Sequence, residues 1–117
     1  MATVESCVQA VSGSIIVDGE GYPHQEVRDV VVSDLMSDVL LVDLEEFILV
    51  TSLASDQVIR TADIVGAAGV ILTNGKQPQT SMVQLAREQR ITLLRTTLRS
   101  FEAAISLAEL LGKVSVR

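Results

Sequence analysis

The fold of the chain is indicated most clearly by the segment "FILVTSLASDQVIRTADIVGAAGVILTNGKQP", residues 47–78. It begins with one continuous apolar run, "FILV" (47–50), and contains a second, "GVILT" (69–73). Such short runs between polar residues are typical of strands that are buried on both faces of a parallel sheet. The two runs therefore predict neighbouring strands of an α/β fold.

The segment between the two runs has the spacing of a helix. Its apolar residues recur three or four positions apart, at Val58, Ile59, Ala62 and Val65. We expect Ser55 to cap this helix and Asp56 to pair with Arg60 one turn later. Residues 47–73 thus predict a strand, a helix and a second strand.

The same alternation continues toward the C-terminus. Pro78 suits the first position of the next helix, which is expected to include "SMVQLAREQR" (81–90), and "ITLLR" (91–95) is the third strand. The last helix is expected over residues 96–112, with Gly112 at its end and an inward face formed by Leu98, Phe101, Ile105 and Ala108. The C-terminal half is therefore βαβαβα, with parallel strands joined by right-handed crossovers.

The N-terminal part adds a short helix and two strands. Thr3 is the expected cap of the helix, and the strands are expected over residues 14–17 and 27–32. A further helix is expected to start after Ser33, with Asp34 in its first turn, where a carboxylate suits the helix dipole. No Pro- or Ser-rich linker divides the chain, so we expect residues 1–117 to form one α/β domain with a mostly parallel sheet.

Composition narrows the class of protein. Aromatic residues make up only 3% of the 117 residues, so the core must be aliphatic. The single cysteine, Cys7, excludes an intrachain disulfide, fits a reducing compartment and is expected to be an inert thiol, either packed or at the surface. Neither a secretory signal nor an apolar run of membrane-spanning length is visible. We therefore expect a cytoplasmic protein that does not contact membranes.

Charge is divided unevenly along the chain. Residues 1–75 carry two bases and twelve acids, whereas residues 76–117 carry seven bases and three acids, for a net charge of −6. The negative total argues against nucleic-acid binding, which needs a basic face. The division is compatible with complementary surfaces within one fold, with a basic rim for an anionic ligand, or with charge pairing between subunits.

Polar residues follow each of the three C-terminal strands. They are Thr51 and Ser52, then Thr73, Asn74 and Gly75, then Thr96 and Thr97, with Asp56, Lys76, Arg95 and Arg99 close by in the sequence. Parallel strands end at one edge, where ligands bind and where helix N-termini present unpaired N–H groups to anions. We expect this edge to bind a small anionic metabolite or nucleotide. The alternative is that the hydroxyls are ordinary caps and Asn-Gly an ordinary turn.

Catalytic signatures are missing from the sequence. Neither G-x-x-x-x-G-K-[ST] nor G-x-G-x-x-G occurs, and the single histidine, His24, lies in a Gly- and Pro-rich turn. Asp34 and Asp38 are one helical turn apart and could act as paired carboxylates for acid/base catalysis. Because no histidine or third acid accompanies them at a matching spacing, an enzyme that uses this pair is the weakest of the alternatives. We expect no catalysis, no cofactor and no metal.

The segment "QVIRTADIVGAAGVILTNGKQP", followed by "LA…ITLLRTTLRSFEA", resembles the DRTGG domain. It is also similar to small proteins related to the N-terminal domain of HPr kinase/phosphorylase, and the resemblance covers about residues 10–111. The family's Thr-Gly-Gly segment maps onto Thr73, Asn74 and Gly75, and Asn tolerates a left-handed backbone. The family's Asp-Arg pair is not clearly kept, Asp56 being the nearest match.

The resemblance implies a small regulatory or ligand-binding α/β domain, often found beside CBS domains, with no known reaction. Combined with the polar strand ends, it favours a non-catalytic ligand-sensing module that acts as a homodimer. The alternative is a protein-interaction subunit without a small-molecule ligand, in which "TNGK" (73–76) is only a turn.

Overall fold

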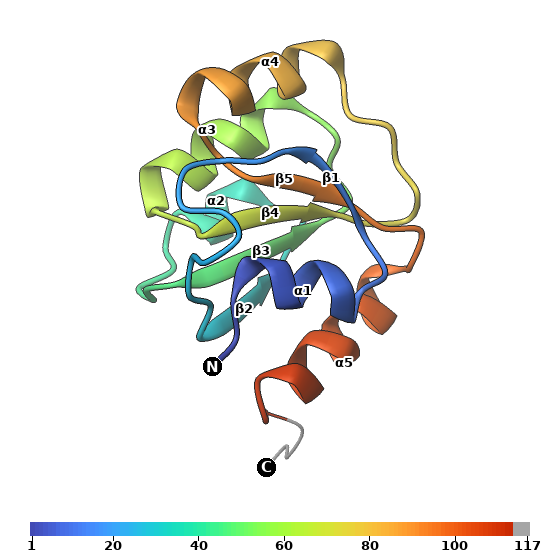
Figure 1. Cartoon of the computed structure of the whole chain (residues 1–117). Coiled ribbons are helices and arrows are strands. Elements are labelled where there is room, and N and C mark those ends of the chain that lie inside the picture. The colour runs from blue at the N-terminus through green and yellow to red at the C-terminus, as the bar shows by residue number, and fades with distance from the viewer. Residues whose placement is uncertain (114–117) are drawn as a thin grey trace.

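The computed structural model describes residues 1–113, which are built around a five-stranded sheet in the order β1-β5-β4-β3-β2 (Figure 1). The strands are β1 (Ser14–Val17), β2 (Asp29–Val32), β3 (Phe47–Thr51), β4 (Gly69–Leu72) and β5 (Leu93–Arg95). Strands β2, β3, β4 and β5 are parallel, whereas β1 pairs antiparallel with β5. The predicted single α/β domain with a mostly parallel sheet is confirmed. Arg117, part of the basic C-terminal segment, lies outside the described residues.

Helices cover both faces of the sheet. They are α1 (Val4–Ala10), α2 (Met36–Val39), α3 (Asp56–Val65), α4 (Thr80–Gln89) and α5 (Ser100–Leu110). Figure 1 shows α3 and α4 on one face and α1 and α5 on the other. Successive residues of a strand point to opposite faces, so Leu49 and Leu72 pack toward α3 and α4, while Ile48 and Ile71 pack toward α1 and α5. Every residue of β3 and β4 is buried, which explains their uninterrupted apolar runs.

The central strand-helix-strand unit forms as predicted. Asp56 and Arg60 make an ion pair of 3.0 Å on the outer face of α3. Ser55 occupies the N-cap position with an extended backbone, although its side chain makes no capping hydrogen bond. The helix ends at Gly66, whose φ of 72° gives the left-handed geometry of a helix stop.

The predicted starts of three helices, α2, α4 and α5, are wrong. Helix α2 is only four residues long and begins at Met36, because the Ser33 hydroxyl accepts the Leu35 N–H in a turn instead of capping a helix. Asp34 therefore lies outside α2 and does not share a helix face with Asp38. Helix α4 begins at Thr80 with Gln79 as its cap, so Pro78 precedes the helix.

The predicted inward face of the last helix is also partly wrong. Phe101 and Ile105 are 68% and 44% exposed, whereas Ala103 and Leu107 are completely buried. Residues 96–99 form a loop rather than the first turn, and α5 begins at Ser100. The loop fixes how α5 is oriented against the sheet and therefore which of its residues are buried. The apolar spacing of the sequence alone does not determine that orientation.

The N-terminal helix caps itself. The Thr3 side chain accepts the Ser6 N–H at 3.2 Å, and the Ser6 hydroxyl accepts the Thr3 N–H at 2.7 Å, which completes a capping box. Cys7, on the buried side of this helix, is fully enclosed, and burial raises the pKa of its thiol to about 11. Of the two alternatives left open for this thiol, packed or at the surface, the structure shows the packed one. No helix within residues 1–113 has the length and apolar character needed to cross a membrane.

Candidate functional site

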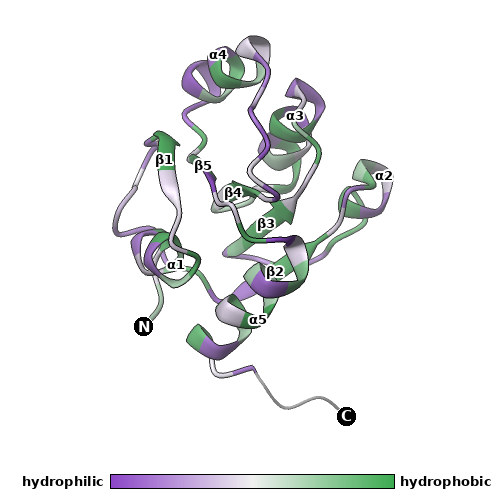
Figure 2. Ribbon diagram, turned by 90° about the vertical axis from the view of Figure 1, so that its right-hand side faces the viewer, coloured by the Kyte–Doolittle hydropathy of each residue, from purple (hydrophilic) through white to green (hydrophobic). Residues whose placement is uncertain are grey.

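The ends of β3, β4 and β5 meet at one edge, as predicted. The Thr73 N–H donates to the Thr51 carbonyl at 2.9 Å, and the Thr96 N–H donates to the Leu72 carbonyl at 2.9 Å, so each strand end is fastened to the next. In Figure 1 the loops that follow β4 and β5 lie together on the right-hand side, and Figure 2 faces that side. The structure therefore brings together the polar residues that follow the three strands.

A carboxylate occupies the end of β3. Asp34 Oδ1 accepts the Thr51 hydroxyl at 2.9 Å and the Ser52 N–H at 2.7 Å, and Asp34 Oδ2 accepts the Ser52 hydroxyl at 2.7 Å. These hydrogen bonds, the Ser52 N–H foremost, lower the pKa of Asp34, and the positive charge of Lys76 lowers it further. The donors expected to face an anionic ligand at β3 are thus already used by the protein's own anion.

This role of Asp34 was not predicted, because the expected edge included the ends of only three strands. Strand β2 is parallel to β3, with Val32 opposite Val50, so the residues after β2 reach the same edge. Asp34 lies two residues beyond β2, as Ser52 lies just beyond β3. Including the fourth strand in the alignment would have placed this carboxylate beside Thr51 and Ser52.

The turn after β4 is fixed by its backbone. Asn74 and Gly75 both have a φ of 62°, so Asn74 does adopt the predicted left-handed conformation. The Asn74 N–H donates to the Leu98 carbonyl at 2.7 Å and the Gly75 N–H donates to the Thr96 carbonyl at 2.9 Å. The N–H groups of Asn74 and Gly75 are therefore already paired, because the neighbouring β5–α5 loop supplies acceptors for them.

Several other polar side chains hold the edge together. Arg95 Nη2 donates to the Gly75 carbonyl at 2.8 Å, and the Thr96 hydroxyl donates to the Val11 carbonyl at 2.7 Å. The hydroxyls of Thr73 and Ser100 share a hydrogen bond of 2.8 Å. Thr51, Thr73 and Thr96 are all buried, so these three threonines are structural supports.

A smaller set of polar groups remains at the surface. Asn74, Lys76 and Thr97 are exposed, and Lys76 makes no ion pair within residues 1–113. Two other charged residues close to the edge in sequence are paired, Asp56 with Arg60 and Arg99 with Glu102. The amide, ammonium and hydroxyl of this exposed trio are groups that donate hydrogen bonds to phosphate or carboxylate oxygens.

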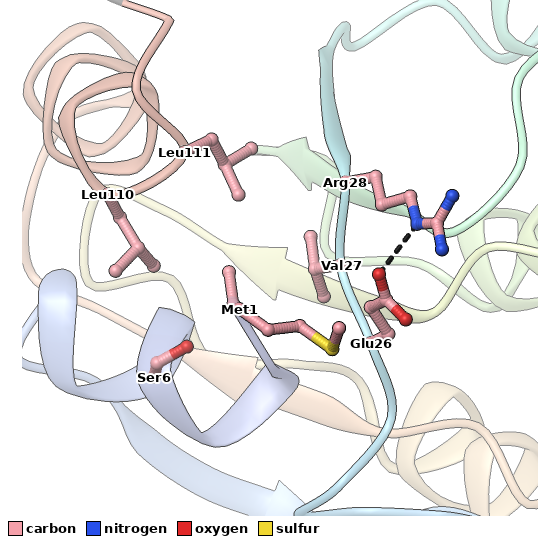
Figure 3. A pocket seen from close by; sticks show the side chains of 8 residues that line it. Met1, Ser6, Glu26, Val27, Arg28, Leu110 and Leu111 are labelled. Carbon is pink, nitrogen blue, oxygen red and sulfur yellow. Dashed lines mark hydrogen bonds and ion pairs between the residues drawn. The ribbon is translucent and has the colours of Figure 1, made fainter.

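Two cavities of the molecule lie away from this edge. The larger, about 530 Å³, is lined by Met1, Ser6, Glu26, Val27, Leu110 and Leu111 among others (Figure 3). Its charged rim is internally paired, since Arg28 Nε donates to Glu26 Oε2 at 2.6 Å. No residue of the polar edge lines either of these cavities, so the exposed trio lies on an open surface. In the part of the chain that the structure describes, no group of three His, Cys, Asp or Glu is arranged to hold a metal ion.

The chain matches the DRTGG domain over residues 6–110. It belongs to the DRTGG domain family. The fold of this DRTGG domain is similar to a crystal structure of the CBS and DRTGG domains of the regulatory region of Clostridium perfringens pyrophosphatase, complexed with its activator, diadenosine tetraphosphate. The TM-score is 0.70 at 18% identity, and the match covers 98% of this chain and 50% of that one. No curated protein matches the chain.

Proposed function

We propose that this DRTGG domain is a non-catalytic regulatory module that binds a small anionic metabolite or nucleotide at the carboxyl edge of its sheet. The observation that carries the proposal is the exposed trio of Asn74, Lys76 and Thr97 on two adjacent strand ends. The turn beneath the trio is held by backbone hydrogen bonds, so little ordering entropy is lost when a ligand binds.

The ligand in this proposal lies on the β4–β5 half of the edge. Asp34 places a negative charge at the end of β3, which repels an anion from Ser52 and Thr51. Lys76 supplies the compensating positive charge. A hydrogen bond to a charged group contributes about 1.5–3 kcal/mol when it is shielded from water, and less at an exposed group such as Lys76. Thr51, Thr73 and Gly75 then support the site through the backbone and do not touch the ligand.

The family supports a regulatory role. The regulatory region of the clostridial pyrophosphatase, which contains a DRTGG domain, was crystallised with a dinucleotide activator, and this chain spans about half of that region. A nucleotide is therefore the first ligand class to test. In the same proposal the protein works in the cytoplasm as a homodimer and passes the bound state to a partner.

The proposal is tested by NMR titration of the isotope-labelled protein with pyrophosphate, ATP and diadenosine tetraphosphate. We expect saturable shifts of the amides of residues 73–77 and 96–100, and at least a tenfold weaker affinity for Lys76→Gln, as expected when a contact of about 1.4 kcal/mol is lost. Lys113→Gln is the matched control, because Lys113 pairs with Asp29 at the far end of β2. Shifts that are absent, or equal in both variants, contradict the proposal.

Exposed leucines around α2 favour a second candidate function, protein interaction without a small-molecule ligand. Leu35, Leu40, Leu41 and Leu44 are all exposed, and Leu41 is 82% exposed. Apolar side chains gathered on a surface mark interaction sites more often than solitary ones do. This candidate predicts a stable hetero-complex with a purified partner that Leu41→Ser weakens and Lys76→Gln does not.

A further inference from the structure

The second cavity, of about 470 Å³, lies at the opposite edge of the sheet from the proposed site. One wall is the end of β1 and the following turn, with Ile16, Asp18 and Glu20, and the other is the end of α4, with Arg87 and Arg90. Strand β1 is antiparallel to β5, so Val17 near the end of β1 is opposite Leu93 at the start of β5. This cavity is therefore separate from the carboxyl edge.

The two walls are held at a fixed separation. The Gly19 N–H donates to Thr92 Oγ1 and the Glu20 N–H donates to the Arg90 carbonyl, both at 2.9 Å. A Cβ at Gly19 would lie 2.4 Å from the Thr92 nitrogen, so only glycine allows this close approach. The turn carrying Asp18 and Glu20 is thereby fastened to the segment carrying Arg90.

Arg90 has an unusual backbone for its residue type. Helix α4 ends at Arg90 with a φ of 58°, whereas α3 ends at Gly66 with a φ of 72°. Left-handed geometry is unfavourable for a residue with a Cβ, and such conformations concentrate at functional sites. The arginine side chain placed there lines the cavity.

Charges of both signs line the cavity without pairing to each other. Arg87, Arg90, Asp18 and Glu20 are exposed, and within residues 1–113 none of them makes an ion pair. Both arginines lie on one wall and both acids on the other. A ligand that carries only negative charge is repelled by Asp18 and Glu20, whereas a ligand that carries both signs is attracted to both walls.

We propose that this cavity binds a free α-amino acid. Arg87 and Arg90 receive the carboxylate, for which the planar guanidinium fork is suited, and Asp18 and Glu20 receive the ammonium group. Ile16 gives the aliphatic part of the ligand an apolar contact. The site is independent of the ligand proposed for the carboxyl edge.

The test is a titration of the isotope-labelled protein with each of the common amino acids at millimolar concentration. We expect at least one to shift the amides of residues 16–20 and 87–92 in a saturable way, and its analogue without the amine to bind about tenfold more weakly. No saturable shift with any amino acid, or equal binding of the amine-free analogue, overturns the proposal.

Arg90→Gly distinguishes a ligand role from a structural one. Glycine suits the left-handed conformation, so we expect this variant to keep or raise the melting temperature while its affinity falls about tenfold or more. Arg87→Gln should lower the amino-acid affinity in the same way without changing the left-handed residue Arg90. Lys76→Gln is the control, and it must leave the amino-acid affinity unchanged. Full affinity in both arginine variants overturns the proposal.

Discussion

Replacing Asp34 with alanine tests how the edge of the sheet is held. The substitution removes an acceptor of three hydrogen bonds, from the Thr51 hydroxyl, the Ser52 N–H and the Ser52 hydroxyl. A hydrogen bond to a charged group contributes about 1.5–3 kcal/mol when it is shielded from water, and exposed charges contribute less. Because Asp34 is exposed, we expect a loss of about 1–2 kcal/mol in the free energy of unfolding.

Calorimetry or circular dichroism measures this loss as a shift of the melting temperature. For a domain of this size, 1–2 kcal/mol corresponds to roughly 4–8 °C. Folding lowers the pKa of Asp34, so its stabilisation is present above the unfolded pKa of about 4 and disappears as the pH falls through the lower folded value. The wild type and Asp34→Ala should therefore differ at pH 7 and converge at strongly acidic pH.

Asp34→Asn separates the charge from the shape of the side chain. The amide oxygen can accept hydrogen bonds but carries no charge, so we expect an intermediate melting temperature. Asp38→Ala is the matched control, because Asp38 is exposed on α2 and makes no ion pair within residues 1–113. Equal melting temperatures for wild type and Asp34→Ala at pH 7, or a constant difference down to strongly acidic pH, would mean that the Asp34 carboxylate does not stabilise the end of β3.

The remaining predictions concern a turn, a helix face and the thiol. Asn74→Gly should leave the free energy of unfolding, measured with urea, unchanged or raise it by about 1 kcal/mol, because Asn74 has a φ of 62° and glycine adopts this angle without strain. A clear loss of stability contradicts this prediction. Leu107→Ala should cost about 2–5 kcal/mol and Phe101→Ser less than about 1 kcal/mol, since Leu107 is buried and Phe101 is exposed; the reverse order would mean that α5 packs through its other face. The free energy of unfolding of the wild type should fall relative to that of Cys7→Ala as the pH rises from 9 toward 11, by about 2–3 kcal/mol in total, because the thiol ionises at lower pH in the unfolded chain than in the folded one. Parallel profiles of stability against pH contradict the raised pKa.

The fold was predictable where one local pattern decided the outcome. The buried runs of β3 and β4 need apolar residues on both faces, and the α3 segment between them has an unambiguous helical spacing. Two of the three helices whose starts were wrong, α2 and α5, are decided by tertiary contacts instead. Asp34 bonds to β3 and so cannot begin α2, and the Ser100 contact with Thr73 fixes where α5 begins.

The candidate site was predictable as a location and not as a set of contacts. Parallel strands bring Thr51, Thr73 and Thr96 to one edge, which follows from topology. Which hydroxyls and N–H groups face solvent depends on neighbouring acceptors, such as the Val11 and Leu98 carbonyls, that come from distant parts of the chain. In the structure Thr51, Thr73 and Thr96 are buried, whereas Asn74, Lys76 and Thr97 are exposed.

The affinity of the labelled protein for diadenosine tetraphosphate, compared between wild type and Lys76→Gln, is the most direct test of ligand binding at the carboxyl edge. We expect saturable amide shifts confined to residues 73–77 and 96–100 in the wild type, and an affinity lower by about tenfold or more in the variant. Shifts located elsewhere, or an affinity that Lys76→Gln leaves unchanged, would contradict it.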